Sequence, residues 1–189
     1  MKPLTLDQFT TTCSKGTRMA DGSVFYLSRA NSKGVLWQNG PIPYTTGITV
    51  DLGGRHTEEE QKSYLANLLP QVNEAVERVS GLREEVARQL LENGCKEYAE
   101  DWGTAAGERI HEDEEVYLMD EGVLLRLPLD DTDFVNSMML QYLTIKVDQQ
   151  GRISMSLQLS FYPDYFMGHV IMGDISPDGT IDIEPSPQG

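Results

Sequence analysis

The sequence predicts an α+β fold in which an antiparallel sheet, made of an N-terminal meander and a C-terminal four-stranded region, packs against an amphipathic helix. Apolar residues recur at steps of three and four through the middle of the chain, as on the buried side of a helix. Before and after this region, β-forming or alternating apolar residues are separated by turn residues, as in successive strands. The two periods together favour strands packed on a helical layer.

The N-terminal region is predicted to be a meander of three strands. Residues 23–28 and 35–38 are rich in β-formers, with a turn expected at 31–34 between them. Asn39-Gly40 marks a tight turn, and residues 48–52 alternate apolar with polar side chains, which predicts the third strand.

The middle of the chain is predicted to be helical. Thr57, followed three residues later by Glu60, has the form of a capping box that opens a helix. An apolar stripe then runs through residues 72–90, where Ser80-Gly81 marks a kink or a restart and Asn93-Gly94 a C-terminal stop.

The region after the central helix combines helix and strand signals. Residues 96–102 are expected to add further helical turns, whereas residues 103–116 match neither period. Residues 123–127 are expected to be extended, and Asp130 or Asp131 is expected to cap a short helix.

Residues 142–183 are predicted to form a four-stranded antiparallel sheet, because apolar and polar residues alternate on both sides of the hairpin turn at 148–151. A chain of 189 residues has the usual size of one domain. We therefore expect a single globular domain over residues 1–184 and a flexible tail over 185–189.

Charge is the main compositional signal. The chain has 30 acidic and 15 basic residues and a formal net charge of −15 at pH 7. Phosphate backbones are bound by basic groups that displace counterions, so we expect no nucleic-acid partner. The acids concentrate in residues 97–121, which contain ten acids and one base.

The acidic run is the candidate partner-binding surface, because clustered charge accelerates the encounter with an oppositely charged protein. The simpler alternative is a solvated face that aids solubility. A calcium site is not expected, since the run lacks the Asp-x-Asp-x-Asp-Gly loop. The candidate residues are Glu108, Glu112, Asp113, Glu114, Glu115, Asp120 and Glu121.

Other classes of site and location are not supported by the motifs. Cys13 and Cys95 lack Cys-x-x-Cys spacing, the three histidines are isolated, and no phosphate-binding glycine loop occurs, so we expect no metal, disulfide or cofactor. No run approaches the about 18 apolar residues of a membrane helix, and residues 1–7 lack the apolar core of a signal peptide. We expect a cytoplasmic protein without membrane contact.

Asp164 and His169 are the candidate ligand contact, because they flank an aromatic turn between two predicted strands. A carboxylate that orients an imidazole is a common general base if the two groups meet within about 3 Å. A hydrolase would also need a nucleophile, and neither Gly-x-Ser-x-Gly nor an activated cysteine is present. The alternative is structural, with His169 bound to turn carbonyls or to Asp164. We assign no catalytic residue.

The order of these elements resembles a bacterial family of unknown function. The resemblance rests on Trp37-Gln38-Asn39-Gly40, the amphipathic helix, the short helix around Phe134, the hairpin at 144–151 and the block Asp164 to Ile171. Members of that family tend to end in an acid, a bulky aromatic, Gly-His and a β-branched strand. The resemblance implies an α+β fold and a bacterial cytoplasmic setting, sometimes beside immunity proteins that neutralise toxins.

Three functional hypotheses follow. The first is a non-enzymatic acidic binding protein, in its most specific form an immunity protein that neutralises a basic toxin domain. The second is a housekeeping or adaptor domain without a dominant electrostatic partner. The third is a small hydrolase or ligand-binding domain centred on Asp164 and His169. The sequence does not predict the oligomeric state.

Overall fold

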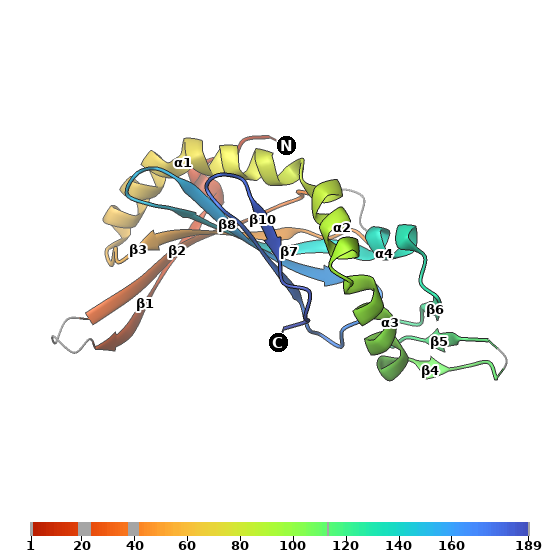
Figure 1. The fold of residues 1–189 in the computed structure, drawn as a ribbon. Coiled ribbons are helices and arrows are strands. Elements are labelled where there is room, and N and C mark those ends of the chain that lie inside the picture. Colours follow the sequence, from red (N-terminus) through yellow and green to blue (C-terminus); the bar gives the residue numbers. More distant parts are fainter. Residues whose placement is uncertain (1, 19–23, 38–41, 113, 189) are drawn as a thin grey trace.

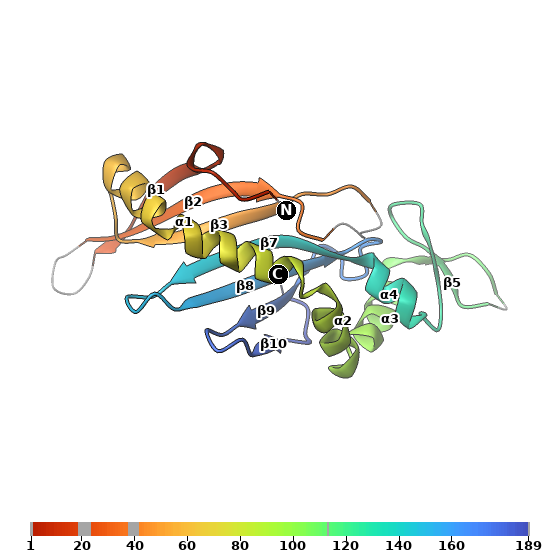
Figure 2. The same ribbon diagram turned by 90° about the horizontal axis from the view of Figure 1, so that it is seen from above.

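The computed structural model describes residues 2–18, 24–37, 42–112 and 114–188, and it confirms the α+β class. Its main element is a seven-stranded sheet of order β1-β2-β3-β7-β8-β9-β10, and α1 lies across one face of this sheet (Figure 1, Figure 2). The strands are β1 (Thr10–Arg18), β2 (Val24–Gly34), β3 (Thr46–Gly53), β7 (Met138–Val147), β8 (Ile153–Phe161), β9 (Ile171–Ile175) and β10 (Ile181–Ile183).

The helices begin and end largely where the capping signals predict. The helical segments are η1 (Leu6–Gln8), α1 (Glu58–Ser80), α2 (Arg83–Glu92), α3 (Cys95–Ala106) and α4 (Asp131–Ser137). The capping box is confirmed, since Thr57 Oγ1 accepts a hydrogen bond from the Glu60 N–H at 3.2 Å. Gly94, with a φ of 75°, separates α2 from α3, and Asp130 caps α4. Within the described residues, no helix is both long and apolar enough to cross a membrane.

The predicted turn at 31–34 is wrong, because these residues continue β2. Asn31 pairs with Thr49 of β3 in the sheet register. Its side-chain amide donates to Thr12 Oγ1 at 3.3 Å and accepts from Thr49 Oγ1 at 3.1 Å. A turn-forming residue thus remains in a strand where both neighbouring strands satisfy its polar side chain.

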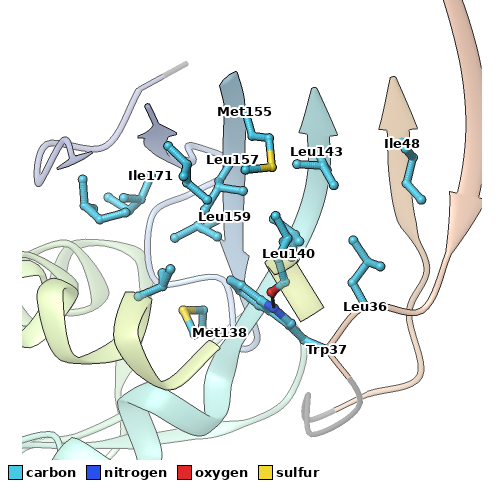
Figure 3. Close-up of a cluster of buried hydrophobic side chains, with 14 of the residues drawn as sticks. Leu36, Trp37, Ile48, Met138, Leu140, Leu143, Met155, Leu157, Leu159 and Ile171 are labelled. Atoms are coloured by element: carbon cyan, nitrogen blue, oxygen red, sulfur yellow. Dashed lines mark hydrogen bonds between the residues drawn. The ribbon is translucent and has the colours of Figure 1, made fainter. Parts of the chain in front are cut away.

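The predicted strand at 35–38 is also wrong over its described part, because residues 35–37 form no strand. Trp37 is buried instead, and its indole Nε1 donates to the Val79 carbonyl of α1 at 3.0 Å (Figure 3). Gln38 and the predicted turn at Asn39-Gly40 lie outside the described residues. The sequence pattern does not predict β1, since this strand is rich in Thr and Ser and has no apolar alternation.

The C-terminal sheet is confirmed as four antiparallel strands, β7 to β10. Its first strand begins at Met138, directly after α4. The meander and this region form one sheet because β3 pairs with β7 in parallel, from Gly47 opposite Tyr142 to Val50 opposite Ile145. The Tyr142 ring covers Gly47, where a Cβ would lie 2.5 Å from a ring carbon.

The main core lies between α1 and the face of the sheet beneath it. Side chains such as Ile48, Leu143 and Leu157 point from their strands to the same side (Figure 3), and they are buried together with Leu65 and Val72 of α1. Complete burial of a Leu, Ile or Val side chain stabilises the fold by about 1.5–3 kcal/mol. The packing of α1 on the sheet thus holds β8 and β9, the strands that lead into and out of the aromatic turn.

The segment predicted as a tail, 185–189, follows β10. Gln188 in this segment exchanges two backbone hydrogen bonds with Val170, at 2.8 and 2.9 Å. The flexibility of the tail and the single-domain boundary stay predictions.

A second, small sheet follows α3 and includes part of the stretch that matched neither period. Its order is β4-β5-β6, and its strands are β4 (Glu108–Arg109), β5 (Val116–Leu118) and β6 (Leu124–Arg126). The last of these lies within the predicted extended segment 123–127. We call residues 108–126, apart from 113, the acidic arm; it lies at the opposite end of the molecule from the β1–β2 hairpin (Figure 1).

Two glycines allow the acidic arm to pack closely against α3. A Cβ at Gly103 would lie 2.5 Å from Leu125, and a Cβ at Gly107 would lie 2.8 Å from the Cβ of Tyr117. Real Cβ atoms essentially never approach other heavy atoms this closely. The glycines therefore permit α3 and the arm to approach this closely, which a residue with a Cβ would prevent.

Candidate functional site

The aromatic turn after β8 is held by Asp164. Its Oδ1 accepts a hydrogen bond from the Phe166 N–H at 3.2 Å, and its Oδ2 accepts one from the Gly168 N–H at 2.6 Å. Both Met167 and Gly168 have positive φ values, 52° and 84°. This backbone conformation is unfavourable for a non-glycine residue such as Met167. The carboxylate thus stabilises a turn that the backbone alone would resist.

His169 binds the same turn from its C-terminal side. Its Nδ1 lies 3.0 Å from the Phe166 carbonyl oxygen, which also accepts the backbone N–H of His169. The imidazole packs edge-on against Trp102 of α3, with ring centroids 5.1 Å apart. Within the described part of the chain, no hydrogen bond or ion pair joins Asp164 to His169. The two side chains do not meet as an oriented carboxylate–imidazole pair; each binds the backbone of the turn.

An aromatic cluster lies beneath the turn and keeps it ordered. Phe134 of α4 stacks on Phe161 at 5.3 Å, and Phe161 meets Phe166 edge-to-face at 5.1 Å. Tyr165 completes the cluster, and burial raises the pKa of its phenol. Aromatic pairs of this kind add about 0.5–1.5 kcal/mol each beyond the burial of their area.

The acidic residues predicted to bind a partner divide into two groups. The first group lies at the β4–β5 hairpin, with Glu108 in β4 and Glu112, Glu114 and Glu115 exposed in the loop that follows. The second group, Asp120 and Glu121, lies in the turn between β5 and β6. Asp113 lies outside the described residues. Glu114 lies 3.6 Å from Arg126, an exposed ion pair that contributes little stability. The loop therefore keeps most of its negative charge available.

The second group of acids meets the aromatic turn at a cavity. The backbone N–H of Asp164 donates to Glu121 Oε1 at 3.1 Å, so the β5–β6 turn and the aromatic turn are directly joined. The cavity has a volume of about 530 Å³, and its carboxylates are Asp120, Glu121 and Asp164. Its apolar walls come from Ala105 and Ala106 of α3, with Met119 and Met167. We call it the acidic cavity.

The small sheet also exposes apolar side chains among these acids. Leu118 and Leu124 face each other across β5 and β6, and 38% and 46% of their surfaces are exposed. Glu108 pairs with Leu118 from the other side. At the rim of the acidic cavity, Met167 is 52% exposed. Exposed apolar residues within a charged rim are the arrangement found in protein interfaces.

Sequence reasoning did not identify Leu118, Leu124 or Met167 as site residues. The two leucines lie in strands of three residues, which are too short for a period of two to be recognised. Met167 is exposed in a turn where it has a positive φ, a conformation that the sequence does not indicate for a non-glycine residue. The glycine that follows, Gly168, is the sequence signal that could have indicated an unusual turn at this point.

The thiols and histidines of the described residues do not form a metal site. Within the described residues, no cluster of three or more His, Cys, Asp or Glu side chains could hold a metal ion. The two thiols differ, since Cys13 is exposed and Cys95 is buried, where burial raises the pKa of its thiol to about 12.

Comparison with known proteins gives no family for the chain. No protein-family model, no curated protein and no solved structure matches it. The resemblance to a bacterial family of unknown function therefore stays a prediction, and the function must be argued from the site.

Proposed function

We propose that this protein is a non-enzymatic binding protein whose acidic arm covers the basic surface of a partner protein. The observation that supports this best is that one small sheet carries three features: a loop of exposed acids between β4 and β5, the acidic cavity at its β5–β6 turn, and an exposed pair of leucines. An acidic loop that served only solubility would need neither the cavity nor exposed apolar side chains.

The acidic cavity suits a lysine or arginine side chain of the partner. Three carboxylates line it, and the alanine and methionine walls suit the aliphatic part of such a side chain. Asp164 already accepts two backbone hydrogen bonds and Glu121 accepts one at Oε1, so the carboxylate of Asp120 and the second oxygen of Glu121 are better placed to pair with an added cation. Charge-assisted hydrogen bonds of this kind are about twice as strong as neutral ones.

The leucine pair supplies a separate, apolar part of the contact. Since a little under half of Leu118 and of Leu124 is still exposed, covering each side chain would contribute about 1 kcal/mol. The partner surface is therefore expected to combine basic residues with an apolar patch. The acids would determine the association rate, and the leucines and the cavity would determine the lifetime of the complex.

The most specific form of this proposal is an immunity protein that neutralises a basic toxin domain. The resemblance to a bacterial family found beside such proteins supports it, as does the net charge of −15. In this form, the acidic arm would cover the basic residues by which a toxin domain binds its own target. Growth rescue of cells that express the toxin would be the functional readout.

Affinity capture with matched variants tests the proposal. The test variant combines Glu112→Gln, Glu114→Gln and Glu115→Gln, and the control variant combines Glu74→Gln, Glu77→Gln and Glu84→Gln on the exposed sides of α1 and α2. Both variants lose three negative charges. Each protein is used to capture partners from the native lysate at about 50 mM and about 300 mM salt, which differ in how strongly they screen surface charge.

The proposal expects a basic partner that the wild type and the control retain at low salt and that the test variant loses. A partner retained equally by all three proteins at both salt concentrations would refute the acidic arm as the binding surface. In that case a partner without an electrostatic preference, as for an adaptor domain, would be the better account.

A further inference from the structure

A second candidate surface lies at the other end of the molecule, along the free edge of β1. This strand is nine residues long and pairs with β2 on one side. Among the described residues, no strand pairs with its outer side, since β1 is the first strand in the order of the sheet. An edge strand of this length, at about 3.3 Å per residue, presents backbone N–H and C=O groups over about 30 Å.

Edge strands are normally protected from pairing by charged residues, proline, bulges or short length. Residues 10–14 of β1, by contrast, are Thr-Thr-Thr-Cys-Ser, without charge or proline, and most of them are exposed. The irregular register of β1 with β2 begins only after Lys15. The first half of β1 is therefore a regular edge to which another strand can be added.

The β1–β2 hairpin has a charge opposite to that of the whole protein. In sequence, the two strands contain four bases, Lys15, Arg18, Arg29 and Lys33, and no acid. The chain as a whole carries −15. A basic strand pair on an acidic protein favours an acidic partner, because attraction to this end is combined with repulsion from the rest of the surface.

A groove lies between this edge and the beginning of α1. Its volume is about 530 Å³, within the range of ligand pockets. Thr11 and Cys13 line it from β1, and His56, Glu58, Gln61 and Lys62 line it from the loop before α1 and the start of α1. Glu58 and Lys62 form an ion pair, so this side of the groove carries little net charge. Both strand residues are on the α1 side of the sheet, because they pair with Ala30 and Ser28, which are buried there.

The floor of the groove is held in place by buried polar contacts. Gln61 of α1 is buried, and its Nε2 donates to Ser28 Oγ at 3.3 Å and to the Arg55 carbonyl at 3.0 Å. The ring of His56 stacks on Tyr26 of β2 at a centroid distance of 5.1 Å. The groove is thus already formed in the free protein, which lowers the entropic cost of binding.

We propose that the groove between β1 and α1 binds an extended acidic segment of a partner protein, which adds to the sheet as a further strand beside β1. The backbone of the segment pairs with the free edge of β1. Alternate side chains of the segment point toward α1 and enter the groove, since side chains alternate along a strand. The acidic residues of the segment are those on its other face, on the side of the sheet away from α1, where Arg29 pairs with Thr12. This site is independent of the acidic arm and of the function proposed for it.

A library of displayed random peptides about 12 residues long, enough to cover β1, is the probe for this site. The wild type is compared with Thr11→Trp, which fills the groove, and with Thr144→Trp, which adds the same side chain at an exposed position of β7 away from this edge. We expect acidic peptides to be enriched on the wild type and on Thr144→Trp, and not on Thr11→Trp.

Alkylation of Cys13 in the wild type gives a second readout that needs no variant to fold. Cys13 is exposed in the groove and Cys95 is buried, so iodoacetamide distinguishes them by mass spectrometry. A synthetic copy of a selected peptide, at about ten times its Kd, should slow alkylation of Cys13 about tenfold, because about a tenth of the grooves stay empty.

The proposal is overturned if no acidic peptide is enriched on the wild type, or if the enriched peptides leave the alkylation rate of Cys13 unchanged. It is also overturned if the protein alone protects Cys13 as its own concentration rises, with dimers seen by sedimentation. That result would assign the edge of β1 to a second copy of the chain.

Discussion

The substitution Asp164→Ala tests whether this carboxylate holds the aromatic turn. It removes the acceptors of two backbone hydrogen bonds, at 3.2 Å from the Phe166 N–H and 2.6 Å from the Gly168 N–H. Asp164 is half-buried, so water can replace part of this loss. By analogy with the loss of a helix cap, we expect the free energy of unfolding to fall by about 1–2 kcal/mol.

The effect is large enough to measure by thermal unfolding. In a protein of this size, each kcal/mol shifts Tm by about 2–4 °C, so Asp164→Ala should lower Tm by about 2–8 °C. Asp164→Asn is the matched variant, because its amide keeps one acceptor oxygen, and it should lose about half as much. Circular dichroism during heating provides the measurement.

The opposite result would refute the reasoning. If Asp164→Ala unfolded at the same temperature as the wild type, the two hydrogen bonds would contribute nothing to the turn. If the same variant also lost a catalytic activity, Asp164 would have a chemical role, and the hypothesis of a site centred on Asp164 and His169 would regain support.

The remaining predictions concern the strain, packing and titration of other groups. Met167→Gly should raise the free energy of unfolding by up to about 1 kcal/mol in urea titrations, since glycine tolerates the positive φ, and yet weaken partner binding through loss of the exposed side chain. Gly107→Ala should cost about 1–3 kcal/mol and shift the NMR signals of the acidic arm, because its Cβ would meet Tyr117, whereas Gly54→Ala, with no heavy atom within 4 Å, should do neither. For Cys95, the raised thiol pKa means that the unfolded chain loses its proton first, so the free energy of unfolding should fall as pH rises from about 9 to about 12, and this slope should be smaller in Cys95→Ala. Equal slopes in the two proteins would show that the thiol is not responsible.

Local signals in the sequence were sufficient for the helix boundaries and the C-terminal hairpins. The capping box at Thr57 and Glu60 and the stop at Asn93-Gly94 involve residues close in sequence, and the structure places both as predicted. The alternation through β7 and β8 likewise reports a strand with one buried face. Such features depend on neighbours along the chain, which the sequence displays directly.

Features that depend on distant contacts were not predictable in the same way. The parallel pairing of β3 with β7 joins residues more than 90 positions apart, and no local pattern specifies it. The strand β1 is polar because it is an edge, and the turn-like residues at 31–34 stay extended because both neighbouring strands bind Asn31. In each case the tertiary environment overrides local propensity.

The candidate site was predicted in two separate pieces. Sequence reasoning identified the acids of the arm and, independently, Asp164 and His169. The structure joins them through the hydrogen bond from the Asp164 N–H to Glu121 and through the acidic cavity. This contact spans 43 positions in sequence, and two glycines leave the room in which α3 packs against the small sheet. Neither feature is visible as a motif.

The association rate constant with the captured partner, measured against salt concentration, tests the central claim most directly. We predict that the rate for the wild type falls steeply between about 50 mM and about 300 mM salt. At low salt, the variant with glutamines at Glu112, Glu114 and Glu115 should associate about tenfold more slowly, with a flatter salt dependence. The control variant on α1 and α2 should behave like the wild type. Equal rates for all three proteins, or a rate that is independent of salt, would contradict the proposal that the acidic arm is the docking surface.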